Sequence, residues 1–156
     1  MLPWLEATAL ATWVRESPSL LAYPTVLTLH TAGLGIVVGA AVVVDLRLLG
    51  YARGIRVSTL EPLFTFMAWA FALNAVTGVL LFIADATTKA KQPVFYVKLS
   101  LIFLALWCTF ATRRIVRDNS ESTAAETVPA HGARLATASL LLWAGAIAAG
   151  RLMAYL

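Results

Sequence analysis

The chain has 156 residues, of which 60% are hydrophobic and 13% are charged, and its mean hydropathy is +0.81. Soluble domains are roughly 45–50% apolar and about 25% charged, so this composition excludes an ordinary water-soluble globule. Twelve Lys and Arg residues against eight Asp and Glu leave a net charge of +4. The basic residues are scattered at the ends of apolar runs, which argues against a nucleic-acid-binding stripe. We expect one membrane domain that covers residues 1–156.

The first segment, residues 1–17, is amphipathic and too short and polar to cross a membrane. Its apolar side carries Trp4 and Trp13, whereas Glu6 and Arg15 lie on other sides. This pattern predicts a helix that lies in the membrane interface. A cleaved signal peptide is the alternative, but the first charge is an acidic residue, so the basic start that is typical of a signal peptide is missing.

Four apolar stretches are each long enough to cross about 30 Å of hydrocarbon at about 1.5 Å per residue. The predicted spans are, approximately, residues 24–46, 62–84, 93–112 and 133–156. The third contains Lys98 and the fourth contains Arg151, which a span tolerates if the charge lies near an interface or faces protein. The sequence therefore predicts an all-α fold, an integral membrane four-helix bundle with an N-terminal interfacial amphipathic helix.

The connections between the spans predict an orientation. With four spans, both termini lie on one side of the membrane, and the connections over residues 45–61 and 113–134 lie on the other. Within the second connection, residues 113–131 are predicted to form a polar cytoplasmic loop. Seven arginines belong to this second side: Arg47, Arg53, Arg56, Arg113, Arg114, Arg117 and Arg134. The positive-inside bias then predicts cytoplasmic loops and periplasmic termini in a bacterial inner membrane.

A layer of polar side chains is expected in the outer half of the membrane. Counting along antiparallel spans places His30, Lys98 and Arg151 at one depth, with Asp85 nearer the surface and Asn74 a turn deeper. Ionisable groups inside a bilayer are expensive and tend to face the protein interior or a wet cavity. Two cations and an imidazole at one depth predict an anionic group between them, either the carboxylate of this layer or a bound ligand.

Each of these residues also has a simpler interpretation. Lys98 and Arg151 lie near helix ends and can extend to the surface, and Asp85 can pair with Lys98 or cap a turn. His30 can be a hydrogen-bonded imidazole of the bundle, a metal or haem ligand, or a contact for a proton or ligand. Asn74 can join two helices by a hydrogen bond worth about 1 kcal/mol.

Several ligands would satisfy the predicted layer. A haem with its propionates directed at Lys98 and Arg151, a quinone head group or a small carboxylate would each suit it. Haem iron usually takes His as an axial ligand, with His, Met or Cys as the other. The second histidine, His131, lies on the order of 20 Å from His30 by helix rise and cannot share its metal. The candidates are therefore a pair of His30 with Met153, or a five-coordinate iron.

Small residues predict where the helices pack closely, and the single cysteine limits the thiol chemistry. Gly35 and Gly39 form a GxxxG pattern, which predicts close helix approach inside the bundle or at a homodimer seam. Cys108 is the one cysteine, so an internal disulfide or a CxxC pair is excluded. The sequence has no Walker loop, GxSxG elbow or HExxH motif, so hydrolytic and phosphoryl-transfer chemistry lack visible machinery.

An acidic residue closes the first span. Asp45 lies on about the same helical face as His30, about four turns away. We expect it to pair with Arg113 or Arg114 and to lock the cytoplasmic rim. A proton path from Asp45 to His30 is the alternative, although the stripe between them is apolar.

Three segments carry a resemblance to known proteins: WLEATALATWVRES near the start, LHTAGLGIVVGAAVVVDLRLLG over 29–50 and FYVKLSLIFLAL over 95–106. They resemble a bacterial family of small, uncharacterised four-span membrane proteins over roughly the whole chain, and DLRLLG is the most specific part. The LH…G…D layout also resembles, more distantly, the first helix of membrane copper-resistance proteins of the CopD type and of b561-like cytochromes. That likeness implies a haem- or metal-related role for His30, although this chain lacks the additional intramembrane histidines of those bundles.

Two functions from different classes follow. The first is a membrane protein whose outer-half pocket binds haem b, a quinone or a small anionic ligand, with electron transfer as the expected role of a bound haem or quinone. The residues of this predicted pocket are His30, Lys98, Arg151, Asp85, Asn74 and Met153, with His30 as the metal ligand. The second is a non-catalytic accessory subunit that packs its glycine faces against a homodimer partner or a larger membrane complex.

Overall fold

The computed structural model describes residues 2–51, 53–121 and 128–155, which form helices and their connections. This confirms the all-α prediction. In chain order the helices are α1 Pro3–Glu6, α2 Ala9–Glu16, α3 Tyr23–Leu48, the 3-10 helix η1 Val57–Leu60, α4 Glu61–Ala84, α5 Ala86–Lys89, α6 Pro93–Glu121 and α7 Ala130–Leu152.

Helices α3, α4, α6 and α7 are each long and apolar enough to cross a membrane. A proline stands in the first turn of three of them, where its missing N–H would have no helical partner: Pro24, Pro62 and Pro93. The chain is thus a multi-pass membrane protein with four candidate spans.

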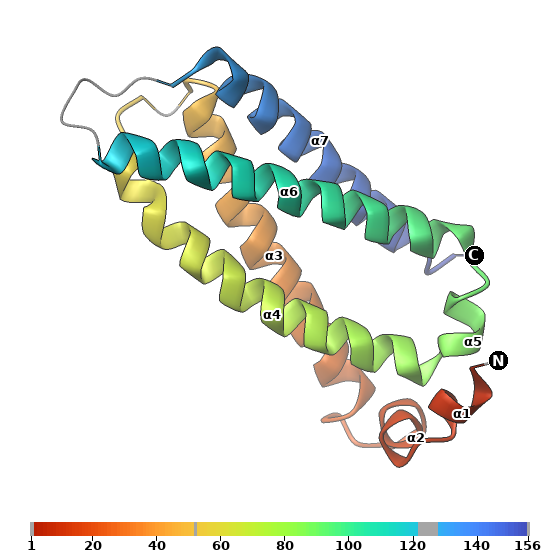
Figure 1. Ribbon diagram of the computed structural model, residues 1–156. Helices are drawn as coiled ribbons and strands as arrows, with labels where there is room; N and C mark the ends of the chain where they lie inside the picture. The colour runs from red at the N-terminus through yellow and green to blue at the C-terminus, as the bar shows by residue number, and fades with distance from the viewer. Residues whose placement is uncertain (1, 52, 122–127, 156) are drawn as a thin grey trace.

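The four long helices pack as two antiparallel pairs (Figure 1). Helices α3 and α4 form one pair, α6 and α7 form the other, and α3 lies beside α7, whereas α4 and α6 contact each other little. Both chain ends lie at one end of the bundle, which we call the terminal end. The opposite end contains the α3–α4 connection and the start of α7, and we call it the arginine end.

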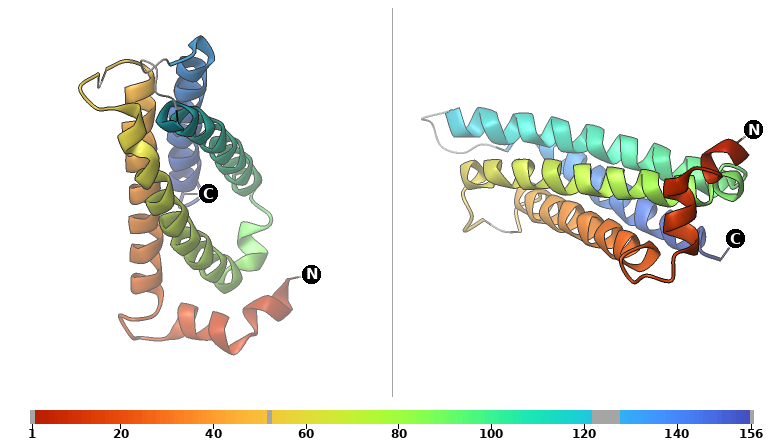
Figure 2. Two further views of the ribbon diagram at one scale, coloured as in Figure 1. Left: turned by 60° about the vertical axis from the view of Figure 1, so that its left-hand side comes forward. Right: turned by 90° about the horizontal axis from the view of Figure 1, so that it is seen from below.

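The short N-terminal helices lie across the terminal end of the bundle (Figure 2). The amphipathic segment was expected as one helix over residues 1–17, but the structure has two. They are separated because the Thr8 side chain accepts a hydrogen bond from the backbone N–H of Ala11 at 3.3 Å and so caps a new helix, α2.

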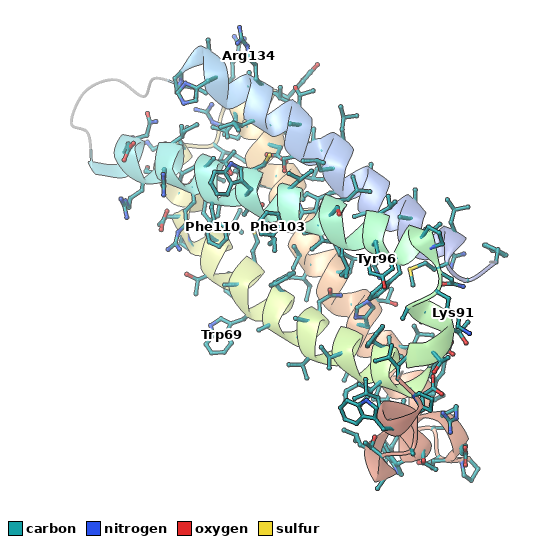
Figure 3. All side chains as sticks on the ribbon, turned by 45° about the vertical axis from the view of Figure 1, so that its right-hand side comes forward. Trp69, Lys91, Tyr96, Phe103, Phe110 and Arg134 are labelled. Carbon is teal, nitrogen blue, oxygen red and sulfur yellow. The ribbon has the colours of Figure 1, made fainter. Side chains whose placement is uncertain are left out.

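Large apolar side chains cover the outer surface of the bundle (Figure 3). Trp69, Phe103 and Phe110 are 74%, 68% and 62% exposed, and Trp69 extends away from the helices in this view. Such exposure would be costly in water, whereas lipid tails are as apolar as these side chains. The surface therefore suits hydrocarbon.

Glycine packing differs from the prediction. Gly35 and Gly39 face outward, and a Cβ added at either would meet nothing within 4 Å. The close approach of α3 to α4 occurs instead at Gly33, where an added Cβ would lie 3.0 Å from the carbonyl oxygen of Ala70. The GxxxG pattern was therefore wrong as a guide to packing inside the bundle, because its two glycines lie on the other side of α3.

Both ends of the predicted polar connection, residues 113–131, are helical in the structure. Helix α6 continues to Glu121, because Ile115 and Val116 still pack into the bundle, where they are 7% and 0% exposed. Helix α7 begins at Ala130, before the predicted start of the fourth span. Residues 122–127 of the predicted loop lie outside the described residues.

Candidate functional site

A cavity of about 700 Å³ lies at the terminal end, bordered by both helix pairs. Residues from α2, α3, α4, α5, α6 and α7 line it, and Asp85 at the α4–α5 junction contributes as well. Among the lining residues are Arg15, His30, Asp85, Lys89, Lys98 and Met153. We call this space the terminal cavity; its volume falls in the range of small-molecule sites, about 300–1,000 Å³.

His30 is held from one side by two residues of α4. Its Nδ1 lies 3.0 Å from the backbone carbonyl oxygen of Asn74 and 3.2 Å from Oγ1 of Thr77. The Asn74 amide nitrogen donates to the backbone carbonyl of His30 at 2.7 Å. The buried asparagine thus joins α3 to α4 and fixes the imidazole in the same contact.

These hydrogen bonds assign the tautomer of a neutral His30 ring. A backbone carbonyl can only accept, so Nδ1 carries the proton that it donates to Asn74. The Thr77 hydroxyl donates to the carbonyl of Leu73 at 2.7 Å and can accept from the same ring nitrogen. The lone pair is then on Nε2, for which no hydrogen-bond partner is found among the described residues. An imidazole fixed through Nδ1 and open at Nε2 is the arrangement of a ligand-binding histidine.

Gly78 makes room for this imidazole. A Cβ at position 78 would lie 3.1 Å from Cε1 and 3.5 Å from Nδ1 of His30. Any larger residue would displace the ring, so the glycine permits the close fit of the imidazole against α4.

Lys98 reaches the same cavity from α6. Its side chain runs past Gly150, where an added Cβ would lie 3.7 Å from Nζ. The ammonium group interacts electrostatically with the His30 ring and with Lys89. Within the described part of the chain, the half-buried Lys98 has neither a hydrogen-bond acceptor nor a carboxylate partner. It is therefore a cation for which the described residues supply no counter-charge.

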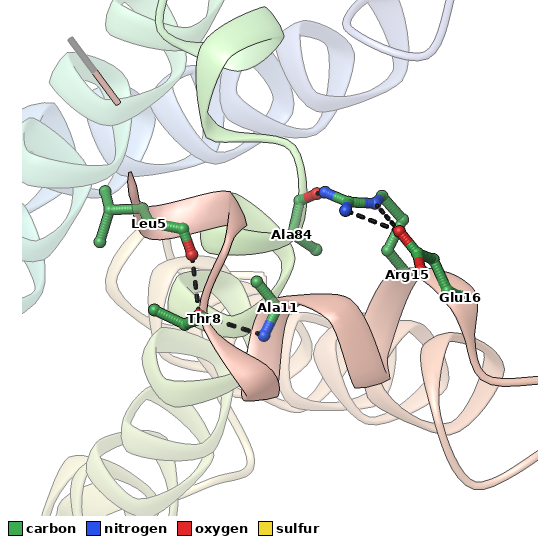
Figure 4. A network of polar contacts seen from close by, with 6 residues as sticks. All are labelled: Leu5, Thr8, Ala11, Arg15, Glu16 and Ala84. Carbon is green, nitrogen blue, oxygen red and sulfur yellow. Dashed lines mark hydrogen bonds and ion pairs between the residues drawn. The ribbon is translucent and has the colours of Figure 1, made fainter. Parts of the chain in front are cut away.

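Two further cations border the terminal cavity on the side of the chain ends. Lys89 lies 3.9 Å from Asp85 and donates to the carbonyl of Met153 at 3.4 Å. Arg15 donates to the carbonyl of Ala84 at 3.2 Å, as Figure 4 shows. With Lys98, three cations and one carboxylate line the cavity, which gives it a positive excess.

The N-terminal helices are fastened to this end by polar contacts. Glu6 accepts a hydrogen bond from the backbone N–H of Thr87 at 2.6 Å, which lowers the pKa of that carboxyl. Arg15 lies 2.8 Å from Glu16, and the hydrogen bond to this carboxylate raises the pKa of the guanidinium. Helix α2 is thereby held over the cavity that Arg15 helps to line.

Aromatic side chains supply part of the apolar wall. Phe82 of α4 stacks on Phe95 of α6, with ring centroids 5.1 Å apart, and both line the terminal cavity. This stack joins the two helix pairs at a depth where α4 and α6 otherwise contact each other little.

The structure brings together most of the predicted site residues. His30, Lys98, Asp85 and Met153 line the terminal cavity, whereas Asn74 is buried behind the histidine that it positions. Arg151 is exposed and lies outside the cavity lining. Its neighbour Gly150 occupies the cavity side of α7. Because successive residues of an α-helix are rotated by about 100°, the side chain of Arg151 faces away from the cavity.

Sequence reasoning missed Arg15 and Lys89 as cavity residues. Sequence analysis gave neither residue a role in the pocket, because the sequence does not show that α2 and α5 fold over the ends of the spans. The amphipathic pattern of α2 gave the one available indication that this helix lies against the bundle.

The acidic residue of DLRLLG is also placed differently from the prediction. Arg113 pairs with Glu61 at 3.2 Å, so the predicted lock between Asp45 and Arg113 or Arg114 is wrong. Asp45 is instead buried, with 1% exposure, and has a side-chain hydrogen bond with Ser139 of α7.

The donor set at the terminal cavity restricts the metals that fit. Within the described residues, no group of three or more His, Cys, Asp or Glu side chains could hold a metal ion. One histidine with a free Nε2 does fit an iron whose remaining ligands belong to a porphyrin.

Comparisons of the chain with protein-family models, curated proteins and solved structures gave no match. The resemblance to small four-span bacterial membrane proteins accordingly stays a prediction.

Proposed function

We propose that the chain is a membrane protein whose terminal cavity binds an anionic cofactor or small ligand. The observation that carries this proposal is Lys98, a half-buried ammonium that faces a cavity of about 700 Å³ without a carboxylate partner among the described residues. A buried charge is stable only when it is paired. A carboxylate or phosphate group of a ligand would supply the missing partner.

A b-type haem is the cofactor that uses the largest number of these groups. His30 would hold the iron through Nε2, Lys98 and Lys89 would hold the propionates, and Met153, which lines the same cavity, is the candidate for a second iron ligand. The stacked phenylalanines would cover part of the macrocycle. Bound haem would supply one-electron transfer. A quinone is the alternative, since its carbonyl groups can accept hydrogen bonds from the same lysine.

The absorption spectrum of the purified protein tests the haem proposal. We expect haem uptake to give a Soret band that His30→Ala abolishes and His131→Ala preserves. His131 is the matched control, because it is exposed at the arginine end. A protein that is colourless as purified and takes up no added haem would remove haem as the cofactor.

The anion-binding proposal is tested separately by Lys98→Met. Charge-assisted hydrogen bonds are worth about 1.5–3 kcal/mol, so loss of this ammonium should weaken binding of haem or a short-chain quinone by roughly ten- to a hundredfold. Lys91→Met is the control, because Lys91 is exposed at the same end (Figure 3). Equal affinities for the two variants would contradict a role for Lys98 in ligand binding.

A second candidate function is that of an accessory subunit. The observation in its favour is the outward face of α3, where Gly35 and Gly39 leave open space for another helix. Purification in a mild detergent tests it. A stoichiometric partner or a homodimer that is lost in Gly35→Leu would support this function, and a solitary monomer would oppose it.

We also propose that the arginine end faces the cytoplasm of a bacterial cell and that both termini are periplasmic. The positive-inside bias supports this orientation, since the arginines of the connections gather at that end. A reporter fused after Leu156 that is active only in the cytoplasm would overturn it.

A further inference from the structure

The carboxyl group of Asp45 has an unusual position for an acid. It lies one turn from the end of α3 at Leu48, in the core of the bundle, with 1% of the residue exposed. One interaction is a hydrogen bond with the side chain of Ser139 on α7. The second carboxyl oxygen, Oδ2, is buried and has no hydrogen-bond partner among the described residues.

No cation of the described chain pairs with this carboxyl group. Arg113 of α6 is paired with Glu61, and Arg47 of α3 donates to the carbonyl of Ile55. The titratable group that interacts with Asp45 from α6 is the thiol of Cys108, which is uncharged in its ordinary state. Further charged or titratable side chains at this end are exposed: Arg53, Arg56, Arg114, Arg117, Asp118, His131 and Arg134.

An ionised carboxylate in this place would be unfavourable. Burial of an unpaired charge costs several kcal/mol, whereas a neutral carboxylic acid with one hydrogen bond costs far less. We infer that Asp45 takes a proton from bulk water and is held as a neutral acid, so that Asp45 and Ser139 form a buried proton-binding site at the arginine end.

A second cavity, of about 390 Å³, lies at the arginine end and is lined by Arg47, Leu48 and Ala133 among others. Neither Asp45 nor Ser139 lines it, but Leu48 follows Asp45 by three residues and lies on the same side of α3, one turn nearer the end of the helix. The proposed proton-binding site is therefore at the arginine end, apart from the ligand site at the terminal end.

Infrared difference spectroscopy tests the proton-binding site. At neutral pH we expect the carbonyl stretching band of a protonated carboxyl group, shifted in heavy water, in the wild-type protein and its loss in Asp45→Asn. Asp118→Asn is the matched control, because Asp118 is an exposed acid of α6 and should contribute no such band. Absence of a protonated-carboxyl band that Asp45→Asn removes would overturn the inference.

A second variant keeps the test decisive if Asp45→Asn fails to fold. Ser139→Ala retains the acid but removes its hydrogen-bond partner, so the carbonyl band should persist and move to higher frequency. An unchanged band in Ser139→Ala would show that the protonated group is not the one that contacts Ser139, and would refute the site. Neither outcome depends on whether a ligand binds in the terminal cavity.

Discussion

Substitution of Gly33 by alanine should loosen the contact between α3 and α4. The new Cβ would lie 3.0 Å from the carbonyl oxygen of Ala70, 3.2 Å from the backbone nitrogen of Asn74 and 3.3 Å from Cβ of Asn74. Two of these neighbours are backbone atoms, which cannot rotate away as the tip of a flexible side chain can. The two helices must therefore move apart.

The size of this effect follows from two opposing contributions. Overpacking in a well-filled contact costs about 1–3 kcal/mol, while replacing glycine by alanine in a helix gains up to about 1 kcal/mol. With the full helix gain of about 1 kcal/mol, Gly33→Ala should therefore lower the free energy of unfolding by about 0–2 kcal/mol.

Gly35→Ala provides the matched control. The substitution is the same and lies in the same helix, but the new Cβ would meet nothing within 4 Å. Its helix-propensity gain equals that of Gly33→Ala, so the difference between the two variants measures the contact alone, about 1–3 kcal/mol. Equilibrium unfolding of the detergent-solubilised protein by sodium dodecyl sulfate, followed by circular dichroism, would give both values. Equal stabilities, or a less stable Gly35→Ala, would refute the assigned helix faces.

Three further predictions concern the polar contacts. Asn74→Leu removes the 2.7 Å hydrogen bond to His30 and should cost about 1 kcal/mol in the same unfolding assay, together with weaker ligand binding. The pKa of Glu6 is lowered, so its hydrogen bond to α5 stabilises the docked N-terminal helices fully above the ordinary carboxyl pKa near 4.5. This stabilisation is lost as the pH falls through the lowered pKa of the folded state, and hydrogen exchange in α1 and α2 should become faster there. Glu6→Gln should show the faster exchange already at neutral pH. Arg113→Ala breaks a partly exposed pair with Glu61 and should change stability by at most about 1 kcal/mol, whereas a loss of several kcal/mol would mean that this pair is an essential lock.

The position of a residue along the length of the bundle was predictable from the sequence. Counting residues along antiparallel spans placed His30 and Lys98 at one depth, and both side chains line the terminal cavity. The structure has Lys98 against Gly150 and the His30 ring against Gly78. Such counting works because every residue of an α-helix advances by about 1.5 Å, whatever surrounds it.

The direction in which each side chain faces was less predictable. In a soluble bundle the apolar stripe identifies the buried side of a helix, but here apolar residues face both the core and the lipid. On α3, Val37 is 2% exposed and Ile36 is 52% exposed, although both are aliphatic. The sequence pattern therefore did not show whether Gly33 or Gly35 packs against α4.

The two misplaced charged residues have this same cause. Arg151 was assigned to the pocket and Asp45 to the rim because each had the right depth, yet the arginine is exposed and the acid is buried. The identity of their neighbours explains both outcomes. Small or short residues on the inward side of α7, Gly150 and Ser139, leave room for a partner from another helix, Lys98 in one case and Asp45 in the other. Small residues therefore mark the packed side of a helix only where a side chain of another helix lies opposite them, as at Gly150 and Ser139 of α7, and Gly35 and Gly39 of α3 lack such a partner among the described residues.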